Sequence, residues 1–359
     1  MKILILANND VGLYQFRRDL IEAMLRKGHQ VVISLPDGPL VAPLVEMGCR
    51  FLDTRVDRRG INIFTDLKLL RRYRRILKDE TPDLVIGYTI KPNIYGGLAC
   101  QRTGIPYAVN ITGLGTAFQK RDLLRGLVVS LYKHALKKAK VVFFENAANR
   151  RLFIDEKIVP PEKCCLLNGA GVNLEHYTYA PYPQTGPVRF LFVGRVMKEK
   201  GIEELFAAME RLHAEGEDCA LDVLGLHEED YADHIRRGQT QGWLCYHGYQ
   251  KDVRPFIQKA HCFVLPSYHE GMANTNLECA SMGRPLITSR IPGCREAVSE
   301  NSGLLCKPQD TDDLYKAMKI FLHLTPEARE AMGKAGRRHM EEVFDKKKVV
   351  SNTLKGLGI

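Results

Sequence analysis

Two glutamates flank a small polar turn in the stretch HEGMANTNLECASMGRP, residues 269–285. Glu270 and Glu278 stand on either side of the turn, and a strand-like run, CFVLPS (262–267), ends just before it. If a helix begins after Gly271, its unpaired backbone N–H groups favour an anion. Glu270 would then point into a cleft or into solvent. Thr275 and Glu278, by contrast, match the capping box S/T-x-x-E, so Glu278 has a structural explanation that Glu270 lacks.

Two cations follow another strand-like run in the same half of the chain. The stretch FVGRVMKEKGIEEL (192–205) has the pattern of a strand, a short loop and a helix that begins near Gly201. Arg195 stands at the strand end and Lys200 just before the helix, where two cations beside helical N–H groups form a natural phosphate site. A basic surface loop is the alternative, and Lys198 could reach the same place. Together with the two carboxylates, this set predicts a bound diphosphate flanked by acceptors for hydroxyl groups.

The first half of the chain offers weaker candidates. The stretch ANNDVGLYQF (7–16) has one glycine, Gly12, and lacks the G-x-G-x-x-G fingerprint of dinucleotide sites. Gly12 could let a ligand approach closely, but an ordinary tight turn explains it equally well. Asn110 and Thr112 lie in the glycine-punctuated stretch NITGLGTAFQ (110–119), and Lys91 in GYTIKPNIYGG (87–97) could meet a phosphate.

The elements that must position these residues alternate along the whole chain. Strand-like runs cover 3–8, 30–36, 49–55, 83–89, 107–113, 141–146 and 164–169, and then 189–195, 219–226, 244–249, 262–267, 284–290 and 303–308. Helix-like stretches separate them, and such alternation predicts parallel sheets with crossover helices. Two series of this kind predict an α/β fold of two doubly wound domains.

A proline-rich stretch without periodicity, YTYAPYPQTGP (177–187), separates the two series. We therefore expect a first domain over 1–175, a linker over 176–187 and a second domain over 188–340. The helical stretch 341–359 could pack back on the first domain. Ligands bind beyond the carboxyl ends of parallel strands, so the expected site is a cleft between the two sheets.

Composition and charge restrict the function further. No run of about 18 apolar residues is present, and ten scattered cysteines without a CxxC pair indicate a reducing cytoplasm rather than a disulfide or zinc framework. Residues 1–180 hold 28 Lys+Arg and 17 Asp+Glu, so the whole net charge of +10 lies in the first half. Its densest stretches are KLLRRYRRILK (68–78) and residues 120–140. These are either solvated helix faces or a surface for anionic lipid or a phosphate-bearing partner; no recognition motif for nucleic acid accompanies them.

Three segments of the second half match the sequence pattern of a known enzyme family. On the segments FVGRVMKEKG, HGYQKDV and FVLPSYHEGMANTNLECASMGRPLITSRIPGCREAV, the chain resembles the retaining family-4 glycosyltransferases of the GT-B fold. The two glutamates match that family's E-x7-E motif. The run PGCREAV (292–298), with NITGLG and KPNIYGG, resembles the branch that builds capsule, O-antigen and related bacterial glycans. The resemblance implies two Rossmann-like domains that face each other across a cleft.

The resemblance also implies roles for residues at matching positions. Arg195 and Lys200 would neutralise the leaving diphosphate of a nucleotide sugar, Glu270 would accept hydrogen bonds from the donor sugar, and Glu278 would bind the ribose. Further donor-binding positions are Gly12, Tyr249, Gly271, Met272, Ala273 and Asn274, and the acceptor-side candidates are Asn110, Thr112 and Lys91. No metal and no cofactor beyond the nucleotide sugar is implied, because the two cations do the electrostatic work of a metal.

The chain departs from the family pattern in two places. Many members carry a histidine in a first-domain cleft loop, whereas here only His29 and His134 precede residue 176, both in helix-like stretches. The usual proline of the E-G-x-P stretch is also missing, since Met272 and Ala273 follow Gly271. These departures put a histidine role, and the shape of the sugar pocket, in question.

The implied function is retaining transfer of a hexosyl or N-acetylhexosaminyl group from a nucleotide diphosphate sugar, a UDP-sugar being favoured. The acceptor would be a polyprenyl-diphosphate-linked glycan at the cytoplasmic membrane face, where the basic first domain would hold the protein peripherally. The alternatives are a GT-B-fold UDP-sugar 2-epimerase, which uses acids and a histidine, and a binding protein with a degenerate cleft. The missing histidines and the intact set Arg195, Lys200, Glu270 and Glu278 favour the transferase.

Overall fold

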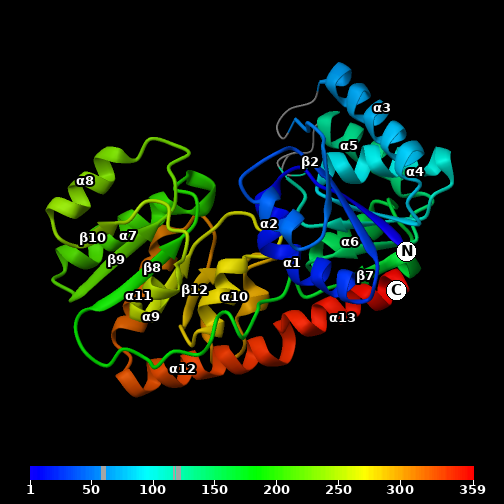
Figure 1. Cartoon of the computed structure of the whole chain (residues 1–359). Coiled ribbons are helices and arrows are strands. Elements are labelled where there is room, and N and C mark those ends of the chain that lie inside the picture. The colour runs from blue at the N-terminus through cyan, green and yellow to red at the C-terminus, as the bar shows by residue number, and fades with distance from the viewer. Residues whose placement is uncertain (58–61, 116–117, 119–122) are drawn as a thin grey trace. The chain divides into compact units, whose positions relative to one another are not determined.

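The computed structural model describes residues 1–57, 62–115, 118 and 123–359. The chain divides into two compact units, each of which is an α/β structure with a parallel sheet between helices (Figure 1). Unit 1 comprises Met1–Ala170 together with Lys347–Ile359, and unit 2 comprises Gly171–Lys346. Residues 58–61, 116–117 and 119–122 lie outside the described residues, and they include part of the candidate loop 110–119 and of the basic region 120–140.

The sheet of unit 1 has seven parallel strands in the order β3-β2-β1-β4-β5-β6-β7. Their bounds are β1 Lys2–Leu6, β2 Gln30–Leu35, β3 Arg50–Asp53, β4 Leu84–Tyr88, β5 Tyr107–Ile111, β6 Val141–Phe144 and β7 Cys164–Leu166. Strand β1 is apolar on both faces: Ile3 and Ile5 pack into one core and Leu4 and Leu6 into the other. Continuous apolar strands of this kind are typical of parallel sheets covered by helices on both sides.

The helices of unit 1 cover both faces of this sheet. They are α1 Asp10–Arg26, α2 Val41–Glu46, α3 Ile63–Glu80, α4 Gly97–Thr103, α5 Leu123–Leu136, α6 Ala147–Asp155 and α13 Lys346–Leu357, of which only the first residue, Lys346, belongs to unit 2. On α3 the buried positions Leu69, Tyr73, Ile76 and Leu77 follow helical spacing, so all of the basic residues of the same helix except the half-buried Arg74 are exposed. The last helix, α13, packs Leu354 and Leu357 into the same core as Phe143, and Lys140 donates to the Leu357 carbonyl over 2.6 Å.

The sheet of unit 2 has six parallel strands in the order β10-β9-β8-β11-β12-β13. The strands are β8 Val188–Val193, β9 Cys219–Leu224, β10 Leu244–Tyr246, β11 Cys262–Leu265, β12 Leu286–Ser289 and β13 Gly303–Cys306. The helices are α7 Ile202–Ala214, α8 Ala232–Thr240, α9 Arg254–Lys259, α10 Asn274–Ser281, α11 Thr311–Leu322 and α12 Pro326–His339. The strand order reverses between β8 and β11, as in the Rossmann arrangement.

The strand predictions are confirmed in both units, because each of the thirteen predicted runs overlaps a strand of these two sheets. The prediction of two doubly wound parallel sheets is therefore correct. None of the described helices has the length and apolarity that a membrane span requires. In the part of the chain that the structure describes, all ten cysteines are free, and we find no cluster of His, Cys, Asp and Glu that could hold a metal ion.

A buried arginine fixes the proline-rich stretch 177–187 to unit 2. Arg284 is fully buried, and its guanidinium donates to the carbonyls of Ala180 at 2.5 Å, Pro181 at 2.9 Å and Ala260 at 3.3 Å. The Tyr182 ring lies 5.5 Å from the same guanidinium. Burial of an arginine without a carboxylate partner is costly, so these carbonyls are what make the position tolerable.

Replacing Arg284 by alanine should therefore destabilise unit 2. The change leaves three carbonyls without their donor and opens a cavity, so we expect the free energy of unfolding to fall by about 3 kcal/mol, or a melting temperature lower by roughly 6–12 °C. Thermal unfolding followed by circular dichroism measures this shift. The exposed Arg290, on the same segment, is the control: Arg290→Ala should change stability by less than about 0.5 kcal/mol. Equal melting temperatures for wild type and Arg284→Ala would contradict this stabilising role of Arg284.

Candidate active site

The loops that follow β8 and β11 come together because these two strands are neighbours in the sheet of unit 2. Gly201 adopts a φ of +73°, and a Cβ at this position would lie 2.2 Å from the Pro266 carbonyl oxygen. The N–H of Tyr268 donates to the Glu199 carbonyl over 2.9 Å. Only glycine allows this close approach, which fixes the end of the first loop against the end of β11.

Lys200 and Glu270 meet at this junction. The Lys200 Nζ lies 2.5 Å from the Glu270 Oε1, and the buried Ser267 hydroxyl donates to the same oxygen over 2.9 Å. Only 19% of the Lys200 side chain and 12% of the Glu270 side chain are exposed. Sequence reasoning named both charged residues but missed Ser267, which the end of strand β11 places beside the carboxylate. The arrangement holds one cation and one carboxylate in a fixed position at the edge of the sheet.

The structure also separates Lys200 from its neighbour Lys198, which the sequence could not. Lys198 is 60% exposed and its Nζ lies 3.2 Å from Glu203 on α7, while its backbone N–H donates to Glu229. Arg195 is likewise exposed and pairs with Glu228 over 2.7 Å. Tyr249, also expected near the donor, is 62% exposed after β10. Of the three basic residues in this loop, Lys200 is the one that pairs with Glu270.

The predicted capping box at Thr275 and Glu278 is wrong. Helix α10 begins at Asn274 with Ala273 as its N-cap residue and without a side-chain cap, so Thr275 and Glu278 both lie within the helix. The helix starts earlier than the box requires because the N–H of Ala273 donates to the Gly293 carbonyl over 2.8 Å, which fixes the entry of the chain. Ala273 was expected to offer this N–H to an anion. The first N–H groups of α10 itself receive no side-chain cap from the described residues, as an anion site requires.

Glu278 is consequently free of a capping role. Its carboxyl group forms a hydrogen bond with Tyr177, and Lys346 lies near it. Burial raises the pKa of Glu278 to about 7, although Tyr177 and Lys346 both act to lower it. The tyrosine comes from the stretch that precedes the first strand of unit 2, so no sequence signal around Glu278 indicated this partner.

The candidates of unit 1 lie at the carboxyl ends of its strands or just beyond them. The N–H of Gly12 donates to the Asn9 side chain within the first turn of α1. Asn110, near the end of β5, is buried, and its backbone carbonyl accepts a hydrogen bond from the side-chain amide of Asn93 over 2.9 Å. Thr112 is partly exposed. Lys91, expected to meet a phosphate, is already paired with Asp66 at 2.9 Å. Its charge is therefore compensated within unit 1.

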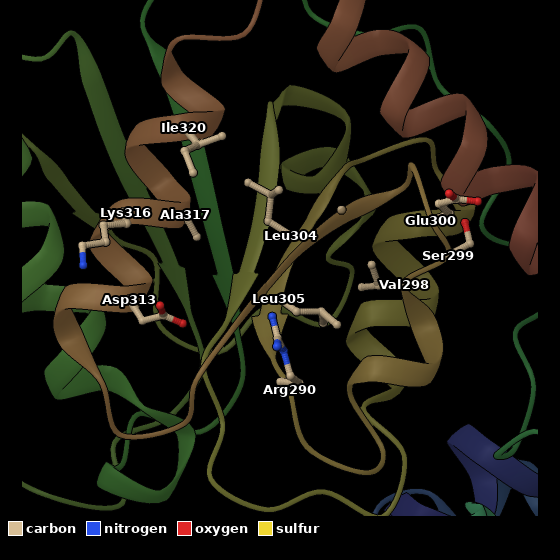
Figure 2. A pocket seen from close by; sticks show the side chains of 11 residues that line it. Arg290, Val298, Ser299, Glu300, Leu304, Leu305, Asp313, Lys316, Ala317 and Ile320 are labelled. Atoms are coloured by element: carbon tan, nitrogen blue, oxygen red, sulfur yellow. The ribbon is translucent and has the colours of Figure 1, made fainter.

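A separate groove of about 580 Å³ runs along the edge strand β13 of unit 2 (Figure 2). Leu304 and Leu305 lie at its centre, and α11 contributes Lys316 and Ile320 on one side. None of Arg195, Lys200, Glu270 and Glu278 lines this groove. The candidate site is instead the set of loops at the carboxyl ends of the unit 2 strands.

Both halves of the chain match known glycosyltransferase domain families. Residues 12–170 match the Glycosyl transferase 4-like domain, and residues 182–339 match Glycosyl transferases group 1. A Campylobacter jejuni protein, the N,N'-diacetylbacillosaminyl-diphospho-undecaprenol alpha-1,3-N-acetylgalactosaminyltransferase, is 26% identical over 90% of this chain and 89% of its own length. The Escherichia coli UDP-Gal:alpha-D-GlcNAc-diphosphoundecaprenol alpha-1,3-galactosyltransferase is 27% identical over 72% of this chain and 71% of its own length.

Solved structures extend the likeness to the fold. The structure of HepE from Anabaena in complex with UDP and glucose has a TM-score of 0.81 at 15% sequence identity, over 100% of this chain and 99% of that one. A glycosyltransferase structure from Rickettsia africae has a TM-score of 0.81 at 16% identity, over 99% of this chain and 97% of that one. At this level of identity the likeness establishes a shared fold.

The raised pKa of Glu278 predicts a pH-dependent stability. Between its ordinary value of 4.5 and about 7, the folded protein keeps a proton that the unfolded chain releases. The stability that the protonated carboxyl contributes is complete below pH 4.5 and is lost as the pH rises through 7. Glu278→Gln, which keeps the shape without the charge, should match wild type at pH 4 and melt roughly 5–10 °C higher at pH 8.

Differential scanning fluorimetry at the two pH values tests this. Glu300→Gln, at an exposed position of the same unit, is the control and should shift neither melting temperature. A Glu278→Gln variant less stable than wild type at pH 8 would show that the carboxylate is stabilised in the folded protein.

Proposed function

Since the chain belongs to the GT-B glycosyltransferases, with a Glycosyl transferase 4-like domain followed by a Glycosyl transferases group 1 domain, we propose that it transfers a sugar from a nucleotide diphosphate sugar to a lipid-diphosphate-linked glycan. The reaction would serve the assembly of a bacterial capsule or related polysaccharide. UDP is the favoured nucleotide, because the E. coli relative is named for UDP-Gal and the HepE structure contains UDP.

The observation that carries the donor half is the Lys200–Glu270 pair beside the uncapped start of α10. The donor diphosphate would draw the Lys200 ammonium toward itself and take further stabilisation from the first N–H groups of the helix. Glu270, released from Lys200 but still held by Ser267, would accept hydrogen bonds from the sugar hydroxyls. Glu278 would hold the ribose, and Arg195 would exchange Glu228 for the phosphates.

The proposed chemistry is retaining and needs no metal for charge neutralisation. The acceptor hydroxyl attacks the anomeric carbon on the face from which the diphosphate departs. The bond from that carbon to the diphosphate oxygen breaks as the new glycosidic bond forms, and the hydroxyl proton passes to the leaving phosphate. Lys200 and Arg195 lower the barrier because they face charge that develops on the diphosphate oxygens.

The acceptor half rests on the relatives and on the surface of unit 1. Both the C. jejuni and the E. coli relatives carry diphospho-undecaprenol in the names of their acceptors. On α3 the apolar side chains of Ile63, Phe64 and Leu67 are 69%, 78% and 43% exposed. Exposed basic residues continue along the same helix: Lys68, Arg71, Arg72, Arg75 and Lys78. Exposed apolar side chains next to basic ones suit an anionic membrane surface, where we propose that the protein docks peripherally on the cytoplasmic side.

The 2-epimerase alternative is less well supported. Such an enzyme needs an acid or base that removes a proton from the sugar, and a histidine was the expected group. In unit 1, His29 lies just before the start of β2 and His134 is exposed on α5, so neither follows the carboxyl end of a strand. Solvent deuterium that enters the sugar when the enzyme is incubated with a nucleotide sugar alone would favour the epimerase.

The donor half makes a kinetic prediction. Lys200→Ala and Glu270→Gln should each reduce kcat/KM for the nucleotide sugar by about 100-fold or more, which is roughly 3 kcal/mol of transition-state stabilisation. The matched control is Lys198→Ala, because Lys198 lies in the same loop but pairs with Glu203. Radiolabelled sugar transfer to a lipid-linked acceptor measures the rates. Full activity in Lys200→Ala, or an equal loss in Lys198→Ala, would contradict the assignment.

The membrane half makes a separate prediction. On vesicles that contain anionic phospholipid, Phe64→Ser combined with Ile63→Ser should weaken binding about tenfold, because two apolar side chains no longer enter the interface. Arg71→Glu with Arg75→Glu should abolish binding that depends on anionic lipid. Cosedimentation measures both effects. The control is Val45→Ser, an exposed apolar residue of α2 in unit 1, which should bind as wild type does. Unchanged binding of the α3 variants would show that this helix does not contact the membrane.

A further inference from the structure

The turn after β12 supports the turn that carries Glu270. Gly293 lies in this second turn with a φ of +87°, and a Cβ there would come within 2.7 Å of the carbonyl oxygens of both Glu270 and Gly271. The backbone of Gly293 therefore packs directly against the backbone of the Glu270 turn. Its carbonyl also accepts the N–H of Ala273 over 2.8 Å. The residues from Glu270 to Ala273 thus rest on one glycine from a different loop.

A single carboxylate fixes the orientation of that glycine. The N–H of Gly293 donates to the Glu296 Oε2 over 2.7 Å. The Glu296 side chain is 26% exposed and its other oxygen lies 3.7 Å from the Arg295 Nε. The Glu296 backbone is itself held from α12, since its carbonyl oxygen lies 2.9 Å from the His339 Nε2. With its N–H bonded to Glu296 and its carbonyl bonded to Ala273, the Gly293 backbone is held at both of its polar groups.

We infer that Glu296 is a positioning residue for sugar transfer, which acts through Gly293 on the turn Glu270–Ala273. This inference rests on the proposed function, because it assigns the turn a donor to hold. Glu296 does not contact the donor. It fixes the backbone on which Glu270 and the start of α10 depend, and displacements of about 1 Å in a reacting geometry can cost up to a hundredfold in rate.

Three variants separate this role from a general effect on folding. Glu296→Ala removes the acceptor of the Gly293 N–H, and we expect kcat/KM for the nucleotide sugar to fall about tenfold or more, mainly in kcat. Glu296→Gln keeps an oxygen that can accept this bond and should stay within about threefold of wild type. Arg295→Ala, which removes an exposed neighbour that contacts only the outer oxygen of Glu296, should behave as wild type.

Sugar transfer kinetics and donor affinity by calorimetry are measured together with melting temperatures. If Glu296→Gln recovers kcat although it melts near the temperature of Glu296→Ala, the result supports positioning. A loss of activity caused by lower stability alone would affect both variants equally. If Glu296→Ala transfers sugar as fast as wild type, or if Glu296→Gln is as slow as Glu296→Ala, the inference is wrong. If wild type neither binds nor transfers from any nucleotide sugar, the proposed function fails instead. A Gly293→Ala variant that keeps full activity would also overturn the inference, since its Cβ must displace the Glu270 turn.

Discussion

The pairing of β8 with β11 is the constraint on which the candidate site depends. In a parallel sheet the carboxyl ends of neighbouring strands lie at one edge, and at the point where the strand order reverses the connections leave toward opposite faces. This brings Lys200 and Glu270 together although seventy positions separate them in the sequence. Gly201 also approaches Pro266 closely, and the N–H of Tyr268 donates to the Glu199 carbonyl. These two backbone contacts hold the loops together, so that the side chains of Lys200 and Glu270 can form an ion pair.

The Lys200–Glu270 pair is easier to explain by ligand binding than by stability. Removing both charges from water costs several kcal/mol, and the attraction between them only partly offsets this cost. The Ser267 hydroxyl compensates for some of the lost hydration of the carboxylate. An arrangement in which a phosphate replaces the carboxylate and a sugar hydroxyl replaces the ammonium keeps both groups satisfied. On the proposed function, the free protein thus holds its own two charges in the places that the phosphate and the sugar of the donor would take.

The local patterns of the sequence predicted most of the fold. Apolar runs of strand length recur with helical stretches between them, and burial on both faces makes each run apolar throughout, as in β1. Helix α3 was equally predictable, because its apolar positions at helical spacing leave most of its basic positions on the outside. The capping box failed for a reason that no local pattern contains: a hydrogen bond from Ala273 to Gly293, twenty residues away, sets where α10 begins.

The sequence by itself determined the elements of this protein and their order, and it indicated the residue types on which the proposed donor site depends, because periodicity and motif spacing are properties of neighbouring residues. Only the tertiary structure decided which of these residues meet. It paired Lys200 with Glu270 and Lys198 with Glu203, and it neutralised Lys91 with Asp66. It also gave Glu278 a tyrosine partner and a raised pKa, and it placed Gly293 beneath the Glu270 turn. The physical reason is that charge compensation, burial and close backbone contact depend on distance in space, which is set by strand order and loop packing.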